Sequence, residues 1–236
     1  MQRILSLAYN FLSPPIFCDP PNHKNIYQQS LNSVFTLYLY DPEGVSIRAT
    51  CTGFFITEDG LGITSGPIVK SFKGTKIKVV TPDHQEYLGE LMYYPSAPGI
   101  GFVQIKGRKT QKLSISKEPL VDGQDVFVLG IHDSDAYFSN LMVTDMNHPW
   151  VEFKNDDLYN TPVIRTTGFV PIECFGAPLL DEDGKVRAVM FNVELGMGMC
   201  FSLMHLKNIF NENNEWKITK IWKKARERII ESIYRE

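Results

Sequence analysis

The sequence predicts an all-β protein, and three observations support this class. Between residues 34 and 203, short apolar or alternating runs recur at regular spacing, as in Val34–Tyr40. Turn signals that combine acids with glycine separate these runs, at Glu58-Asp59-Gly60 and at 181–184. Helical periodicity is almost absent before residue 203. Short strands with such turns are typical of a β-barrel or a β-sandwich.

Each run is three to thirteen residues long and is rich in β-branched, aromatic or alternating residues, which favour a pleated strand. The run at 75–80 shows the alternation most clearly, with Lys76 and Lys78 between apolar neighbours. The two turn signals each join a pair of runs into a hairpin. The predicted strands are 34–40, 45–57, 61–69, 75–80, 87–94, 101–106, 125–129, 141–144, 163–165, 177–180 and 185–193.

Helical spacing begins only near the C-terminus. A short helix is predicted over 203–210, and a longer amphipathic helix over 213–236. One face of the longer helix is apolar and the other is basic, and its candidate contact residues are Trp216, Ile221, Trp222, Lys223, Lys224 and Ile229. Three interpretations stay open: the helix packs on its own barrel, docks on a partner protein, or lies on a membrane surface.

The composition excludes several classes of function. With 236 residues and 43% hydrophobic content, the chain suits one globular unit or two small lobes. A formal net charge of -3 shows no basic excess, so we expect no nucleic-acid partner. No apolar run reaches the length of a membrane span. The four cysteines are scattered without a CxxC pair, so we expect no metal site, no cofactor, and buried free thiols in a reducing compartment.

The N-terminal stretch of about 17 residues is apolar, contains Arg3 and has no acid before Asp19. This pattern indicates either a mitochondrial targeting segment or a short docking helix that ends at Pro14-Pro15. With the expected free thiols, we predict an intracellular protein, in mitochondria if this stretch is a targeting segment and otherwise in the cytoplasm.

Several segments, in order along the chain, resemble the HtrA (DegP-like) branch of the trypsin-like serine proteases. Residues 51–69, CTGFFITEDGLGITSGPIV, are similar to the strand-turn-strand that carries the family's catalytic histidine. VDGQDVFVLG and IRTTGFVPIECFGAPLLDEDGKVRAV follow in family order, and the resemblance covers about residues 30–212. It implies a trypsin-like double β-barrel at 29–212, with an N-terminal extension (1–28) and the C-terminal helix (213–236).

The same resemblance implies where catalytic residues would stand. The histidine position falls on Pro67, the aspartate position on Gly99 and the serine position on Phe175. None of these side chains can accept a proton or attack a carbonyl, which the family's chemistry requires. The oxyanion-hole glycine position falls on Glu173, whose carboxylate opposes a developing negative charge.

We therefore expect a catalytically degenerate homologue that acts as a structural subunit or a protein-interaction module in a larger assembly. Two alternatives remain at this point. The degenerate cleft could still bind peptides by strand addition, since that uses backbone groups. Cys174, next to the serine position, could also serve as the nucleophile of a residual protease.

Overall fold

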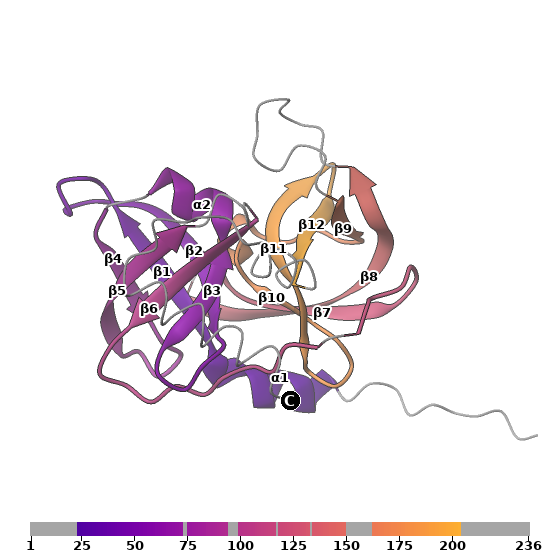
Figure 1. The fold of residues 1–236 in the computed structure, drawn as a ribbon, viewed down its shortest axis with the longest axis horizontal. Helices are drawn as coiled ribbons and strands as arrows, with labels where there is room; N and C mark the ends of the chain where they lie inside the picture. Colours follow the sequence, from indigo (N-terminus) through magenta and orange to yellow (C-terminus); the bar gives the residue numbers. More distant parts are fainter. Residues whose placement is uncertain are drawn as a thin grey trace, which may run out of the picture.

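The computed structural model describes residues 23–72, 75–93, 99–116, 118–132, 134–149 and 162–203. Two β-barrels lie side by side, the first built from the N-terminal half of the chain and the second from the C-terminal half (Figure 1). The predicted all-β class and the double barrel implied by the family resemblance are both confirmed.

The first barrel is closed by six antiparallel strands in the order β1-β2-β3-β6-β5-β4. Its interior is filled by fully buried apolar side chains, among them Phe35 and Phe55, whose ring centroids lie 4.5 Å apart. The hairpin predicted at 58–60 joins β2 to β3, as expected. The strands are β1 (Val34–Tyr40), β2 (Ile47–Phe55), β3 (Leu61–Ser65), β4 (Ile77–Val80), β5 (Glu86–Tyr93) and β6 (Ile100–Ile105).

The second barrel is closed by six strands in the order β10-β11-β12-β9-β8-β7. The hairpin predicted at 181–184 joins β10 to β11, again as expected. Its core is made largely of small and branched apolar residues and includes Cys174 and Cys200. The strands are β7 (Asp125–His132), β8 (Asp135–Pro149), β9 (Pro162–Thr166), β10 (Pro178–Leu180), β11 (Val186–Glu194) and β12 (Met197–Ser202).

Two strand predictions were wrong in extent. The strand predicted over 61–69 ends at Ser65, and the helix α2 (Gly66–Ser71) follows, because Pro67 stands in its first turn, where proline is tolerated and pre-set for a helix. The strand predicted over 141–144 is the middle of β8, a strand of 15 residues. The first half of β8 is mostly half-buried or exposed and lacks the apolar alternation that marks a strand in sequence.

A short helix, α1 (His23–Ser30), crosses the boundary expected at residue 28 and continues into a single 3-10 turn, η1 (Leu31–Ser33). It lies beneath the two barrels in Figure 1. Ile26 is buried in a core cluster that draws residues from both barrels, and the His23 ring packs on Phe127 of β7 at 4.7 Å. The helix therefore packs against the second barrel before the chain enters the first.

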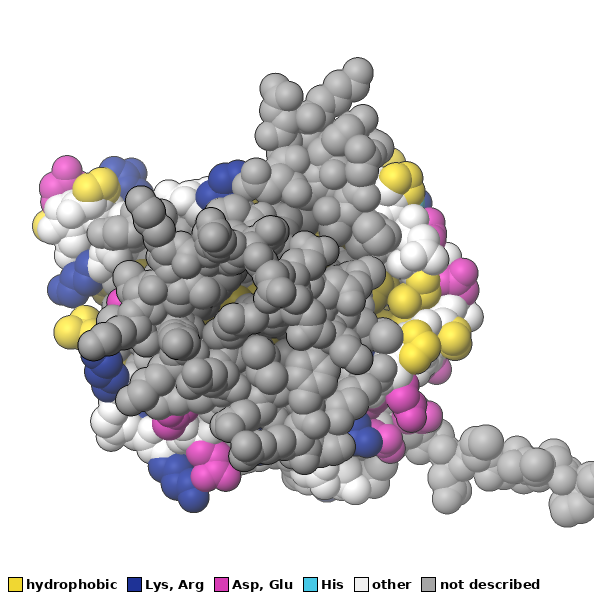
Figure 2. All heavy atoms as spheres, in the orientation of Figure 1, with side chains coloured by type: hydrophobic (Ala, Val, Ile, Leu, Met, Phe, Trp, Pro, Cys, Tyr) yellow, Lys and Arg dark blue, Asp and Glu magenta, His cyan; other side chains and the backbone are white. Residues whose placement is uncertain are grey.

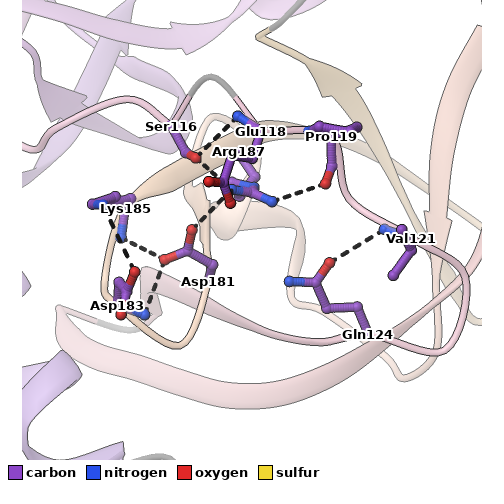
Figure 3. Close-up of polar contacts among 9 residues, drawn as sticks. All are labelled: Ser116, Glu118, Pro119, Val121, Gln124, Asp181, Asp183, Lys185 and Arg187. Atoms are coloured by element: carbon purple, nitrogen blue, oxygen red, sulfur yellow. Dashed lines mark hydrogen bonds and ion pairs between the residues drawn. The ribbon is translucent and has the colours of Figure 1, made fainter. Parts of the chain in front are cut away.

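The connector between the barrels is anchored to β11. Ile115 forms an isolated parallel bridge with Val186, and the backbone N–H of Ser116 donates to the Val186 carbonyl. One residue along β11, the buried Arg187 side chain reaches Ser116, the carbonyl of Pro119 and the carboxylate of Asp181 (Figure 3). This polar cluster ties the connector to the second barrel.

Candidate functional site

The loop between β9 and β10 contains the predicted serine and oxyanion positions. It forms one 3-10 turn, η2 (Ile172–Cys174), closed by hydrogen bonds from Cys174 N to the Pro171 carbonyl and from Phe175 N to the Ile172 carbonyl, both 3.0 Å. The Ala177 N–H then donates to the Cys174 carbonyl at 2.9 Å. The loop is thus closed on itself by three backbone hydrogen bonds within seven residues.

Thr52, a fully buried residue of β2, fastens this loop to the first barrel. Its backbone N–H donates to the Phe175 carbonyl at 3.0 Å, and its hydroxyl donates to the Glu173 carbonyl at 2.8 Å. The same hydroxyl accepts the Ile131 N–H of β7 at 3.0 Å. One side chain therefore joins both barrels and the loop, and no sequence signal marked it, because Glu173 is 121 positions away.

The three predicted triad positions come together at the end of β3. Pro67 opens α2 directly after that strand. The Gly66 N–H donates to the Gly99 carbonyl at 3.1 Å, which brings Gly99 beside the start of the helix. A Cβ built on Gly176, the neighbour of Phe175, would lie 2.3 Å from the Thr64 hydroxyl and 2.8 Å from the Ser65 nitrogen, so this residue packs tightly on β3. Proline, glycine and phenylalanine, which the resemblance places at the triad positions, therefore lie near one another at the end of β3.

No space exists for a side chain at Gly99. A Cβ built there would lie 2.5 Å from the ring of Phe201, a residue of β12 that is 1% exposed. Phe201 belongs to the core cluster that spans both barrels, so the ring cannot move aside without disturbing its neighbours. A carboxylate at this position would therefore need a repacked core.

The oxyanion hole of trypsin-like proteases uses the backbone N–H groups of the nucleophile residue and of the residue two positions earlier. At Phe175, the expected nucleophile position, the N–H donates to the Ile172 carbonyl within the same loop. Glu173 does not adopt the positive φ that a glycine would permit. The Phe175 side chain is half-buried and packs on the core of the second barrel.

Glu173 pairs with a histidine that the sequence did not single out for it. Its Oε2 lies 3.1 Å from Nδ1 of His132, at the end of β7, and both side chains are partly exposed. The two residues are 41 positions apart, so only the closure of the second barrel brings them together. The residue expected at the oxyanion position is therefore part of a carboxylate–imidazole pair.

The three described cysteines are free and buried, as predicted, and Cys18 lies outside the described residues. The Cys174 thiol points toward the Ile131 carbonyl, 3.9 Å away, within the second barrel. Burial, with a smaller contribution from the charge of Glu173, raises the pKa of the Cys174 thiol to about 12. Burial likewise raises the pKa of Cys51, to about 12, and that of Cys200.

Thiol alkylation tests whether the Cys174 thiol is buried and has a raised pKa. At pH 8 only about one thiol in ten thousand is ionised when the pKa is near 12, and the thiolate is the reactive form. We expect iodoacetamide to modify Cys174 at least 100-fold more slowly in the native chain than in urea, as measured by peptide mass spectrometry. Comparable rates in the two states would contradict the buried assignment.

Within the described ranges, no three His, Cys, Asp or Glu side chains are grouped closely enough to hold a metal ion. In that same part of the chain, no helix has the length and apolar character needed to cross a membrane. The C-terminal contact residues predicted from the sequence lie outside the described residues: Trp216, Ile221, Trp222, Lys223, Lys224 and Ile229.

The double barrel has known counterparts. A structure of the Rv3671c protease from M. tuberculosis in its inactive form superimposes with a TM-score of 0.66 and 19% identity, covering 80% of this chain and 93% of that chain. The active form superimposes with a TM-score of 0.67 and 18% identity, covering 85% and 90%. At this identity the likeness concerns the fold. No curated protein is significantly similar to the chain.

A family model of the trypsin-like peptidase domain matches residues 51–189, which run from β2 into β11. The matched part includes the three positions gathered at the end of β3 and spans more than half of the chain. The chain therefore belongs to the family of trypsin-like peptidase domains.

Proposed function

We propose that this chain is a trypsin-like domain that does not cleave peptides and acts as a protein-interaction subunit of a larger assembly. The main support for this proposal is that Pro67, Gly99 and Phe175 lie near one another at the end of β3. Peptide hydrolysis on this fold needs a general base, a carboxylate that orients it and a nucleophile in one place. Proline, glycine and phenylalanine supply none of the three.

The packing around these positions supports the proposal further. Phe201 fills the space that an aspartate at position 99 would occupy. The Phe175 N–H is bonded within its loop, and the Glu173 carboxylate stands beside the same turn. The fold itself is compatible with catalysis, since a solved relative is described as an active protease. The proposed loss of activity therefore follows from the residues at these positions and not from the architecture.

A residual protease that uses Cys174 receives no support from the site. The thiol is fully buried, its pKa is raised to about 12, and it points into the second barrel beside Gly130 and Ile131. A cysteine nucleophile needs a lowered pKa and access to substrate.

The free thiols of Cys51, Cys174 and Cys200 also support a reducing, intracellular compartment for the assembly.

Two assays on the full chain test the loss of activity. We expect no labelling by a fluorophosphonate probe and no cleavage of fluorescent casein above the buffer rate, with an active trypsin-like protease as the positive control. Phe175→Ser should remain equally inactive, because Pro67 offers no base to activate the new hydroxyl. Labelling of the wild-type chain, or casein cleavage that scales with its concentration, would overturn the proposal.

The subunit role has a separate readout. From its native source the chain should elute in a complex well above its own mass of 26.9 kDa, and other proteins should co-elute through a second purification step. Elution as a 26.9 kDa monomer under gentle conditions would contradict the subunit role and leave the catalytic conclusion untouched.

A further inference from the structure

The two barrels differ sharply in charge. Among the described residues from 113 to 203, ten are acidic and three are basic, a formal net charge of -7. Among the described residues from 23 to 112, seven are acidic and nine are basic, a formal net charge of +2. An asymmetry of this size favours a basic partner on the second barrel.

Part of this acidic surface is also apolar and exposed. Val121 is 59% exposed, Met142 is 41% exposed and Phe169 is 70% exposed. Asp122 and Asp125 are exposed beside them, since Asp125 is the strand partner of Met142. We call these five residues the acidic rim. Figure 2 shows hydrophobic and acidic side chains next to one another along the edge of the second barrel.

Backbone contacts hold the acidic rim together. The Gly123 N–H donates to the Val143 carbonyl at 2.8 Å, and Asp122 Oδ1 accepts the Met146 N–H at 3.0 Å, so the turn is fixed on β8. On the other side of Met142, the Thr167 N–H donates to the Met142 carbonyl at 2.8 Å, and Phe169 follows two residues later. The acidic rim is thus a preformed surface, which lowers the entropic cost of binding.

The two carboxylates of the acidic rim are available for a cation. In the part of the chain that the structure describes, no lysine or arginine forms an ion pair with Asp122 or Asp125. The nearby cation Arg187 is instead committed to Asp181, at 3.1 Å. A ligand that carries both cations and apolar side chains would match this surface better than a ligand that carries only one of the two.

The described chain ends close to the acidic rim. The last described residue, Leu203, donates its N–H to the Arg187 carbonyl at 3.2 Å. The Arg187 guanidinium in turn donates to the Pro119 carbonyl at 3.0 Å, two residues before Val121 (Figure 3). Twelve residues separate Leu203 from Trp216, and an extended stretch of that length spans about 40 Å. The C-terminal segment can therefore reach the acidic rim of its own barrel.

The chemistry of residues 213–236 complements this surface. The segment carries seven Lys or Arg residues and four Glu residues, a formal net charge of +3. Its apolar residues recur at helical spacing, with Trp222 and Ile229 on one stripe, and Lys223 and Lys224 lie beside them. Apolar contact with Val121, Met142 and Phe169 and ion pairing with Asp122 and Asp125 can occur in one docked arrangement.

We propose that residues 213–236 dock as an amphipathic helix on the acidic rim of the same chain. The apolar stripe covers the exposed side chains, and the lysines pair with Asp122 and Asp125. The contact closes the chain back on its second barrel and does not depend on whether the domain cleaves peptides.

Carbodiimide cross-linking of the full chain tests the contact directly, because the reagent joins a carboxylate to a nearby lysine amine as an amide with loss of water. We expect monomer-sized products in which Asp122 or Asp125 is joined to a lysine of the segment, identified by peptide mass spectrometry. The Asp122→Asn, Asp125→Asn double variant should lose these products. It keeps an oxygen to accept the Met146 N–H, so the turn is preserved. The candidate lysines are Lys217, Lys220, Lys223 and Lys224.

A matched control removes two exposed carboxylates from the first barrel, by Glu43→Gln and Glu90→Gln, and should leave the cross-links intact. Hydrogen exchange provides a second readout. Amides of 213–236 should exchange at least tenfold faster in the double aspartate variant, with exchange in the barrels unchanged. Absence of the cross-links, their loss in the control variant, or their appearance only in dimer-sized products would overturn the proposal. Unprotected exchange of 213–236 in the wild-type chain would do the same.

Discussion

Replacing Gly176 with alanine should lower the free energy of unfolding by about 2–6 kcal/mol, or prevent folding altogether. Gly176 has φ +93, a conformation that costs a residue with a side chain several times more than it costs glycine. A Cβ there would lie 2.1 Å from the Thr52 carbonyl oxygen and 2.3 Å from the Thr64 hydroxyl. Both threonines are fully buried and bonded to each other at 2.6 Å, so neither can retreat.

Gly123→Ala is the matched control for this prediction. Gly123 also has a positive φ, +84, but a Cβ there would meet no atom within 4 Å. We therefore expect a loss of only about 1–2 kcal/mol, from the backbone conformation alone. Urea denaturation followed by circular dichroism measures both values. Equal losses would mean that the close approach of the loop to β2 and β3 contributes little to stability.

The fold was predictable from the sequence wherever the signal is local. The hairpins at 58–60 and 181–184 were found because acid and glycine residues that favour tight turns stand between apolar runs. The error at the end of β3 has the same local origin. Ile68 and Val69 look like the continuation of a strand, but Gly66 and Pro67 start a helix there.

The candidate site was predictable only in part. Pro67, Gly99 and Phe175 were predicted as the triad positions because the family's segments occur in order along the chain, and the structure places these residues near one another. What packs around them could not be read from the sequence. The ring of Phe201 against Gly99 depends on contacts between residues far apart in the chain, which only the two closed barrels create.

The Glu173–His132 pair illustrates the same limit. The sequence analysis singled out Glu173 as the expected oxyanion position but identified no partner for its carboxylate. His132 is the last residue of β7, and the pairing of β7 with η2 through Thr52 sets it beside the carboxylate. Long-range contacts of this kind carry no periodicity or spacing that a single sequence displays.

Replacing Asp181 with alanine should lower the free energy of unfolding by about 3–5 kcal/mol. Asp181 Oδ2 lies 3.1 Å from Nη1 of Arg187, and the two side chains are only 6% and 5% exposed. The other carboxylate oxygen accepts the N–H groups of Asp183 and Lys185, at 3.0 and 2.9 Å. The variant leaves the buried guanidinium with only the exposed Glu118 carboxylate, 4.0 Å away, and leaves two turn N–H groups without their acceptor.

Asp183→Ala, in the same turn, separates this effect from a general loss of acidic charge. The Asp183 side chain is largely exposed and pairs with Lys185 only at 3.7 Å, so its removal should change the free energy of unfolding by no more than about 0.5 kcal/mol.

A double variant, Asp181→Ala with Arg187→Met, should recover part of the stability lost in Asp181→Ala, because no unpaired charge stays buried. The recovery is expected to be incomplete, since Arg187 also donates to Ser116 and to the Pro119 carbonyl and so anchors the connector between the barrels (Figure 3). Urea denaturation of the three variants measures these changes. Equal losses of unfolding free energy in Asp181→Ala and Asp183→Ala would show that the buried ion pair does not stabilise the second barrel.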